Sequence, residues 1–544
     1  MPGCLDASAG IAVTGAVDTA APPAERAATA LSPALLPAAV AASLAVLAIV
    51  LRWRGSDLPA HFFRVAIVER DGFGVWNNLW YGGHHTLGYG ALFPLLGSVV
   101  GIWTVAIASA GASAFLADVL IRRGTGRHCV LASMWFAVGT VTNVAIGRLP
   151  FALGMAIALG ALVATQRRRM VLTATLTLAT AAASPVVSAF LALAFLAWAW
   201  SCHGRLRVQL AALSVTSIAP VLLIALIYPQ GGTFPFRWPA LVLTLVVSAA
   251  VLALVPASYA VVRRATALYA CAAMVAFVVP TPLGANLTRL GMYAAGPILL
   301  ALAPLSVAVL ALLPVLLFWQ WSPAIDAIVR AGNDPSTERG YYRPLLGYLA
   351  AVGAETGRVE VVPTARHWEA AFVAARFPIA RGWERQLDIR FNPLFYEPDL
   401  SSAAYHTWLL ESGIDRVAVP DAALDDSATE EAALIDRGLP YLRPVWSNGH
   451  WRVFEVIDGR GLVDGAAEVV AMDIDSVTLH VTARGDVLVR VRESPFWVTD
   501  PPVCVEPDED GWIVLRDVPV GRIVIELDES APLTPGSADL CADM

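Results

Sequence analysis

The chain has 544 residues, of which 57% are hydrophobic and 15% charged, and its mean hydropathy is +0.63. A soluble protein carries about 25% charged residues, so this composition excludes an ordinary soluble protein. The net charge of −7 gives no basis for nucleic-acid binding, and the six cysteines show no CxxC pair or other metal-binding spacing.

Residues 1–30 are rich in alanine, proline and threonine and show no periodicity, which predicts a disordered tail. Apolar runs of about 15 to 25 residues follow between 31 and 319 and are typical of transmembrane helices. The first run, 32–52, is long enough to span a bilayer and predicts an uncleaved anchor.

The first loop, 53–90, interrupts the apolar runs with charged and aromatic residues. Its reactive or aromatic members are Asp57, His61, Arg64, Glu69, Asp71, Trp76, Trp80, Tyr81, His84 and His85. So many polar and aromatic side chains between two membrane spans predict a binding or reactive loop at the water boundary.

The arginines give the expected orientation, because basic short loops stay on the cytoplasmic side. The loops around 122–128, 166–169, 203–207 and 263–264 are arginine-rich and are predicted to lie inside. By alternation, the segments predicted to lie outside are 55–89, 147–150, 184–185, 229–239 and 280–291.

The apolar run 292–319 decides the side of the C-terminal region. As one span it would leave that region in the cytoplasm, and as two short spans it would leave it outside. Proline disrupts a helix interior, and Pro297, Pro304 and Pro314 punctuate this run. We therefore expect two spans with a break near Ala303, about eleven spans altogether, and an extracytoplasmic C-terminal region.

The residues after 319 have a soluble composition. Short strands alternate with helical stretches over 320–460, which predicts a small α/β domain. Regular period-two strands such as Val487–Arg492 follow over 461–530 and predict a β-sandwich or similar small β domain, with a flexible tail at 531–544. Cys504 and Cys541 can form a disulfide if this end lies in an oxidising compartment.

Asp57 follows the first apolar run almost immediately. In a helix that begins here, Asp57, His61 and Arg64 share one face at i, i+4 and i+7. Glycosyl transfer needs a carboxylate to accept the acceptor's hydroxyl proton and cations to stabilise a leaving phosphate. The alternative is that Asp57 is an N-cap ahead of Pro59 and that His61 and Arg64 lie on the interfacial surface.

The second half of the loop offers Trp80 and Tyr81 for stacking on a sugar ring. His84 and His85 follow a Gly-Gly turn that would present their imidazoles. A metal there would need further ligands, so we expect none. Aromatic residues also form ordinary belts at membrane interfaces, which is the alternative interpretation.

Two other outside loops carry polar residues at the same depth. Asn143 and Arg148 stand at the end of one span, and Asn286 and Arg289 lie in a proline- and glycine-rich loop. Arginine on the outer side departs from the usual distribution, so these residues are candidates to bind a lipid phosphate or Asp57. The alternative is that they extend to the lipid headgroups.

Three segments of the soluble region combine tryptophan or other aromatics with charged residues. Sugar contact and ordinary domain packing both fit these segments, which are 366–369, 381–385 and 392–396. The sequence contains no Walker A loop and no G-x-S-x-G elbow. It therefore supports neither ATP-driven transport nor an α/β-hydrolase.

The segment SDLPAHFFRVAIVERDGFGVWNNLWYGGHHTLGYGALFPLLG resembles the first extracytoplasmic loop of GT-C-type integral-membrane glycosyltransferases, and more narrowly a group of actinobacterial multispanning proteins. The resemblance implies a helical membrane fold with its active site under the first loop at the outer face. It implies a sugar on polyprenyl phosphate as donor, no metal cofactor, and Asp57 as catalytic base. Many members carry a paired acidic motif, whereas Asp57 stands alone here.

The sequence therefore predicts a lipid-linked sugar transferase of the cytoplasmic membrane acting on an envelope glycan or lipid. The predicted site comprises Asp57 as base, Arg64, Arg148 and Arg289 for the donor phosphate, and His61, Glu69, Trp80, Tyr81, His84, His85 and Asn286 for substrate. The competing hypothesis is a non-catalytic membrane protein for envelope assembly or lipid handling, whose outer domain binds partners. A secondary transporter is disfavoured because the apolar runs contain almost no acidic residue.

Overall fold

The computed structural model describes residues 23–125, 129–332, 334–529 and 541. Within it the chain divides into two compact units. The helical unit comprises the residues up to Leu58 together with Leu87–Gly332, and the C-terminal unit comprises Pro59–Thr86 together with the residues from 333 onward. Most of the predicted loop 53–90 therefore belongs to the C-terminal unit and not to the membrane domain in which we expected it.

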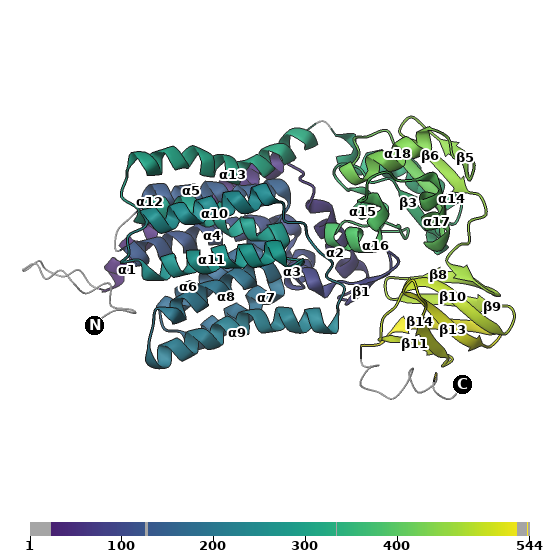
Figure 1. Cartoon of the computed structure of the whole chain (residues 1–544), viewed down its shortest axis with the longest axis horizontal. Coiled ribbons are helices and arrows are strands. Elements are labelled where there is room, and N and C mark those ends of the chain that lie inside the picture. Colours follow the sequence, from purple (N-terminus) through teal and green to yellow (C-terminus); the bar gives the residue numbers. More distant parts are fainter. Residues whose placement is uncertain (1–22, 126–128, 333, 530–540, 542–544) are drawn as a thin grey trace, which may run out of the picture. The chain divides into compact units, whose positions relative to one another are not determined.

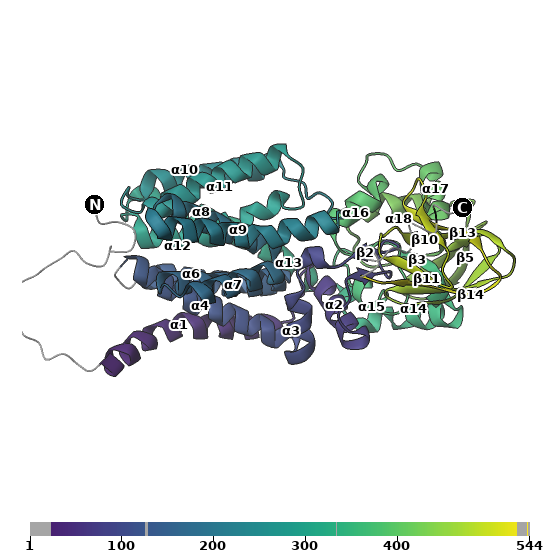
Figure 2. The ribbon, with the colours of Figure 1, turned by 90° about the horizontal axis from the view of Figure 1, so that it is seen from below.

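Apolar helices, most of them long, run side by side as a bundle and make up the helical unit (Figures 1 and 2). They are α1 (Pro23–Val50), α3 (Leu92–Val100), α4 (Ile102–Thr125), α5 (Val130–Ile146), α6 (Leu149–Gln166), α7 (Met170–Ala183), α8 (Pro185–Trp200), α9 (Gly204–Ile227), α10 (Trp238–Leu254), α11 (Ala260–Val278), α12 (Thr288–Leu302) and α13 (Val307–Ala331). The predicted disordered tail differs in part, because 23–30 belong to α1, while 1–22 lie outside the described residues.

Five of the described helices, α4, α6, α9, α11 and α13, are long and apolar enough to cross a membrane. Five more apolar segments of 10–17 residues lie in α1, α5, α7, α8 and α10. The predicted break in the run 292–319 is confirmed, because α12 ends at Leu302 and α13 begins at Val307. The total of about eleven spans stays a prediction.

Small side chains let the helices around α5 approach closely. Ala41, Ala45 and Ala48 of α1 share one core with Ala110 of α4 and Ala137 of α5. Membrane helices gain little from hydrophobic exclusion against lipid, so close packing of small residues is a main source of their association. This packing fixes the position of α5.

Glycines on α5 and α12 receive large side chains from their neighbours. A methyl group on Gly296 of α12 would lie 2.5 Å from the ring of Trp135, which belongs to α5. A methyl group on Gly139 of α5 would lie 2.3 Å from the side chain of Gln320, which belongs to α13. The helix α5 is therefore packed tightly against both α12 and α13, and the end of α5 positions the site described below.

The C-terminal unit contains a mixed α/β domain, as predicted. Its four-stranded sheet has the order β3-β4-β6-β5, with β3 and β4 parallel and the other pairs antiparallel. The strands are β3 (Arg358–Val361), β4 (Ile414–Pro420), β5 (Leu442–Ser447) and β6 (Trp451–Val456). The helices are α14 (Arg339–Ala351), α15 (Glu369–Phe372), α16 (Arg385–Phe391), α17 (Ser402–Glu411) and α18 (Thr429–Asp436).

A β-sandwich follows, with two antiparallel sheets of orders β12-β13-β10-β7 and β11-β14-β9-β8. The strands are β7 (Val463–Asp464), β8 (Ala467–Met472), β9 (Ser476–Val481), β10 (Gly485–Arg492), β11 (Trp497–Asp500), β12 (Cys504–Pro507), β13 (Trp512–Val518) and β14 (Gly521–Leu527). Alternate residues of β10, Val487, Val489 and Val491, are buried in a core that both sheets share, which is the period-two pattern read from the sequence.

The segment Pro59–Thr86 is built into the core of this unit. It contains most of α2 (Leu58–Asp71) and a small hairpin of β1 (Trp76–Asn77) and β2 (His84–His85). Trp76 lies in the sandwich core with 1% of its surface exposed and meets Trp497 edge to face at 5.3 Å. The backbone NH of Asn78 donates to the carbonyl of Ile474 at 2.8 Å.

The same hairpin also contacts the α/β domain. The NH of Ile379 donates to the carbonyl of Leu79 at 2.9 Å, and the indole of Trp80 donates to the carbonyl of Ala370 at 3.1 Å. Gly83 has φ +123°, and a methyl group there would lie 2.4 Å from the ring of Trp76, so glycine is required for this turn. The hairpin thus joins the α/β domain to the sandwich within one unit.

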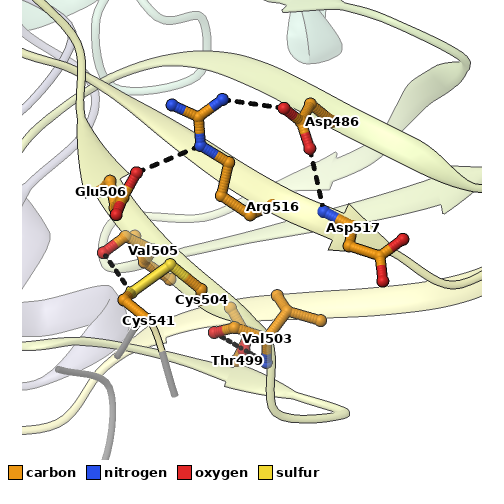
Figure 3. Close-up of a disulfide and its surroundings, with 9 residues drawn as sticks. All are labelled: Asp486, Thr499, Val503, Cys504, Val505, Glu506, Arg516, Asp517 and Cys541. Atoms are coloured by element: carbon orange, nitrogen blue, oxygen red, sulfur yellow. Dashed lines mark hydrogen bonds and ion pairs between the residues drawn. A yellow bond between two sulfur atoms is a disulfide. The ribbon is translucent and has the colours of Figure 1, made fainter. Parts of the chain in front are cut away.

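A disulfide joins Cys504 of β12 to Cys541, 37 residues later (Figure 3). Beside it, Arg516 of β13 bridges Glu506 at 3.1 Å and Asp486 at 2.8 Å. The predicted pairing of these two cysteines is therefore present. The rest of the predicted flexible tail 531–544 lies outside the described residues.

Candidate functional site

Asp57 lies where the chain leaves the helical unit, and α2 begins directly after it at Leu58. Its backbone NH donates to the carbonyl of Ile146, the last residue of α5, at 3.1 Å. A methyl group on Gly147 would lie 3.0 Å from the carbonyl carbon of Asp57, so the two backbones are in close contact. The end of α5 therefore fixes the position of Asp57.

Arg148 is presented by the tight turn between α5 and α6. Gly147 ends α5 in the left-handed conformation with φ 94°, and Arg148 is the N-cap of α6. The Nε of Arg148 lies 3.7 Å from the Oδ2 of Asp57. The two side chains are 18% and 22% exposed, so this ion pair is partly accessible to a ligand.

Arg289, the second residue of α12, brings a second guanidinium group to the same place. It lies over the ring of Phe151 in the first turn of α6, 5.3 Å from the ring centroid. Its charge is close enough to Arg148, Asp57 and Tyr89 to interact with each of them electrostatically. We refer to Asp57, Arg148 and Arg289 as the Asp57 site.

The Asp57 site combines one carboxylate with two guanidinium groups and therefore has a net positive charge. Arg148 also stands at the N-terminus of α6, where the helix dipole favours an anion. Guanidinium groups bind phosphate with paired hydrogen bonds, and a carboxylate can accept a proton from a hydroxyl group. The geometry therefore suits a phosphate and an alcohol bound side by side.

The structure places Asp57, Arg148 and Arg289 near one another, and two tyrosines that the sequence analysis did not name lie beside them. Tyr89 is the last residue of the η1 turn (Leu87–Tyr89), and Tyr293 lies one helical turn after Arg289 on α12. A single tyrosine in an apolar run is typical of an interface residue, so only its distance from the arginines could have identified it.

Asn286, in the η2 turn (Gly284–Leu287), is 7% exposed and its amide lies 3.5 Å from the carbonyl of Pro282.

The remaining predicted residues lie in the C-terminal unit. His61 and Arg64 on α2 are 1% and 7% exposed, and Arg64 forms an ion pair with Glu384. Glu69 lies on the exposed side of α2. Arg64 is thus paired with a carboxylate of its own unit, which argues against its predicted role as a phosphate ligand.

The aromatic half of the predicted loop is buried. Trp80 and Tyr81 are 0% and 2% exposed, and Trp80 stacks on Phe63 at 4.4 Å. Burial lowers the pKa of His84 to about 3 and that of His85 to about 4, so both imidazoles are neutral at physiological pH. These four side chains are at most 8% exposed, which argues against their predicted role in binding a sugar.

The charged segments of the α/β domain form internal ion pairs. Arg381 is 2% exposed and binds Asp388 at 2.7 Å and Glu431 at 3.4 Å. Arg385 binds Asp425 at 2.6 Å. These contacts favour the domain-packing interpretation of 381–385 over sugar contact.

Among the described residues, one group of side chains has the spacing of a metal site. It consists of Cys504, Glu506 and Cys541. The disulfide between the two cysteines already occupies both sulfur atoms, so this group is not a candidate metal centre.

No protein-family model matches the chain, and no curated protein sequence matches it. Among solved structures, the chain is similar to the arabinofuranosyltransferase AftD from mycobacteria, with a TM-score of 0.45 and 16% sequence identity. The similarity covers 76% of this chain and 41% of that structure, so this chain spans less than half of its length.

Proposed function

We propose that this protein is a membrane glycosyltransferase that moves a sugar from a polyprenyl-phosphate donor to an envelope glycan or lipid at the outer face of the cytoplasmic membrane. The observation that carries the proposal is the convergence of Asp57 with Arg148 and Arg289 at one end of an apolar helix bundle. Three separate parts of the sequence supply these residues, as is typical of a binding site that forms when the chain folds.

In the proposed reaction, the Asp57 carboxylate accepts the proton of an acceptor hydroxyl group. The acceptor oxygen then forms a bond to the anomeric carbon of the sugar, and the bond from that carbon to the phosphate oxygen breaks. Arg148 and Arg289 stabilise the negative charge on the departing polyprenyl phosphate. Attack opposite the leaving group inverts the anomeric configuration.

The outer location is supported by two independent features. Residues 59–86 share a folded unit with the chain after 333, so both must lie on the same side of the membrane. The distribution of arginines among the short loops favours the outer side for residues 59–86. The disulfide between Cys504 and Cys541 fits an oxidising compartment. Protease digestion of intact spheroplasts tests this, because cleavage after residue 333 is expected without permeabilisation.

The decisive test is the transfer activity of Asp57→Asn in purified full-length protein with a polyprenyl-phosphate sugar. Loss of the general base is expected to lower kcat at least 100-fold. Asp326→Asn is the matched control, since Asp326 is a half-exposed carboxylate of α13 that pairs with Arg330 one turn away. Its activity should stay within twofold of the unmodified protein.

Full activity of Asp57→Asn would overturn the transferase proposal. Unchanged envelope glycans in cells carrying only that variant would then favour the competing hypothesis, a non-catalytic membrane protein for envelope assembly or lipid handling.

A further inference from the structure

A short chain of buried hydrogen bonds joins α5 to α12 beside the Asp57 site. The hydroxyl of Tyr293 donates to the Oδ1 of Asn143 at 2.7 Å, and it lies 2.5 Å from the Oγ1 of Thr142. The three side chains are 5%, 0% and 0% exposed. Burying polar side chains in a helix bundle costs more free energy than burying apolar ones, so buried polar side chains in such a bundle often have a functional role.

Asn143 holds the turn that presents the first arginine. Its backbone carbonyl accepts from the NH of Gly147 at 2.9 Å and from the NH of Arg148 at 2.8 Å. The same residue that closes the end of α5 therefore uses its side chain to bind α12. Asn143 is in this way connected directly to Arg148.

Tyr293 leads to the second arginine. It lies four residues after Arg289 on α12, which places the two side chains on the same face of the helix. Both stand against Phe151, whose ring centroid is 5.8 Å from that of Tyr293. The Tyr293 hydroxyl is also close enough to Arg148 and Arg289 to interact electrostatically with both.

We propose that Asn143 and Tyr293 are positioning residues that set the separation of the Arg148 and Arg289 guanidinium groups and thereby the affinity for the phosphate of a lipid-linked ligand. Two like charges repel one another, so a separation that suits a phosphate needs a rigid connection between the helices that carry them. The hydrogen bond from Tyr293 to Asn143 is that connection. This inference rests on the proposed function, since it concerns the same phosphate site.

The test measures binding of undecaprenyl phosphate to purified full-length protein in detergent. Tyr293→Phe keeps the ring and its packing but removes the hydroxyl, and it is expected to weaken binding about tenfold. In turnover assays KM for the donor should rise by a similar factor while kcat falls less than threefold. Thr142→Val, which removes the second partner of the hydroxyl, should weaken binding in the same direction by a smaller factor.

A double-variant comparison separates positioning from general loss of stability. If Tyr293 acts through the arginines, Tyr293→Phe should have little further effect on binding once Arg289 is replaced by alanine. Thr177→Val is the control, because Thr177 is buried in α7 and donates within its own helix, to the carbonyl of Thr173 at 2.8 Å. It should leave binding unchanged.

Equal binding by Tyr293→Phe and the unmodified protein would overturn the positioning role and leave the proposed function intact. Additive effects of Tyr293→Phe and Arg289→Ala would also overturn it. Failure of the unmodified protein to bind undecaprenyl phosphate would overturn the phosphate site itself, and the positioning role with it.

Discussion

Glu431 is a buried carboxyl group on α18 whose charge is stabilised only in part. Tyr405 donates to it at 2.9 Å, and Arg381 lies 3.4 Å away. Burial raises the pKa of Glu431 to about 7, although Arg381 opposes the shift. The nearby Glu360 on β3 is fully buried, and burial together with the charge of Glu431 raises its pKa as well.

These raised pKa values predict that the α/β domain loses stability as the pH rises. Between about pH 4.3, the pKa of an unfolded glutamate, and pH 7, the folded state binds more protons than the unfolded state. The free energy of unfolding is therefore highest below this window. It falls as the pH rises through the window, by up to about 1.4 kcal/mol per pH unit for Glu431. Amide hydrogen exchange of β3 and β4 in the full-length protein, corrected for intrinsic rates, measures this.

Glu431→Gln should flatten that pH dependence and make the domain more stable than the unmodified protein at pH 8. The control is Glu430→Gln on the exposed side of the same helix. A pH dependence that is the same in Glu431→Gln and in the unmodified protein would show that Glu431 does not titrate in this range.

At the scale of single elements, the hairpin of β1 and β2 is a structural part of the sandwich. Trp76→Ala should destabilise the sandwich by about 3–5 kcal/mol, because it removes a fully buried indole from the shared core. Faster hydrogen exchange in β9 and β14, which lie about 400 residues later, is the expected result. Phe73→Ala, in the same segment but 47% exposed, should have an effect below about 1 kcal/mol.

The sequence predicted elements well where their pattern is local. The period-two alternation of β10 and the prolines between α12 and α13 both depend on neighbours in the chain, and both are present. The edge strand β11 has only four residues, which are too few to show a clear period-two pattern in the sequence. Sequence alone could not place the hairpin, since the sandwich core around Trp76 and the backbone partners of Asn78 and Leu79 are hundreds of residues away.

The candidate site shows the same distinction. Asp57, Arg148 and Arg289 could be grouped because charged residues at predicted span ends are rare and share one membrane depth. Trp80 and His84 were grouped with them because aromatic and imidazole side chains are typical of sugar-binding sites. The same side chains are equally typical of a packed core. Only their exposed fractions of 0% separate the two interpretations.

At the scale of the whole molecule, the C-terminal unit is discontinuous in sequence. We predict that residues 334–529 expressed alone will be unstable and prone to aggregate, because the sandwich core then lacks Trp76 and the α/β domain lacks its contacts with Leu79 and Trp80. Adding residues 59–86 at the N-terminus through a long flexible linker should restore a soluble fragment with cooperative unfolding.

Circular dichroism and size-exclusion chromatography of the two fragments compare them directly. The matched control carries Trp76→Ala in the added segment and should not restore stability. A fragment of 334–529 that is monomeric and unfolds cooperatively would contradict the prediction.

Residues 59–86 belong to a unit whose last described strand is β14, and this also has a consequence for biosynthesis. At a translation rate of about 5–20 residues per second, the strand β14 emerges about 20 to 90 s after the hairpin. During that interval the eleven described helices from α3 to α13 are made, and the later parts of the chain on which Trp76 and Trp80 pack have not yet been synthesised. The segment of this unit that is synthesised first is therefore among the last to fold. The helical unit is synthesised before that segment can pack against its partners.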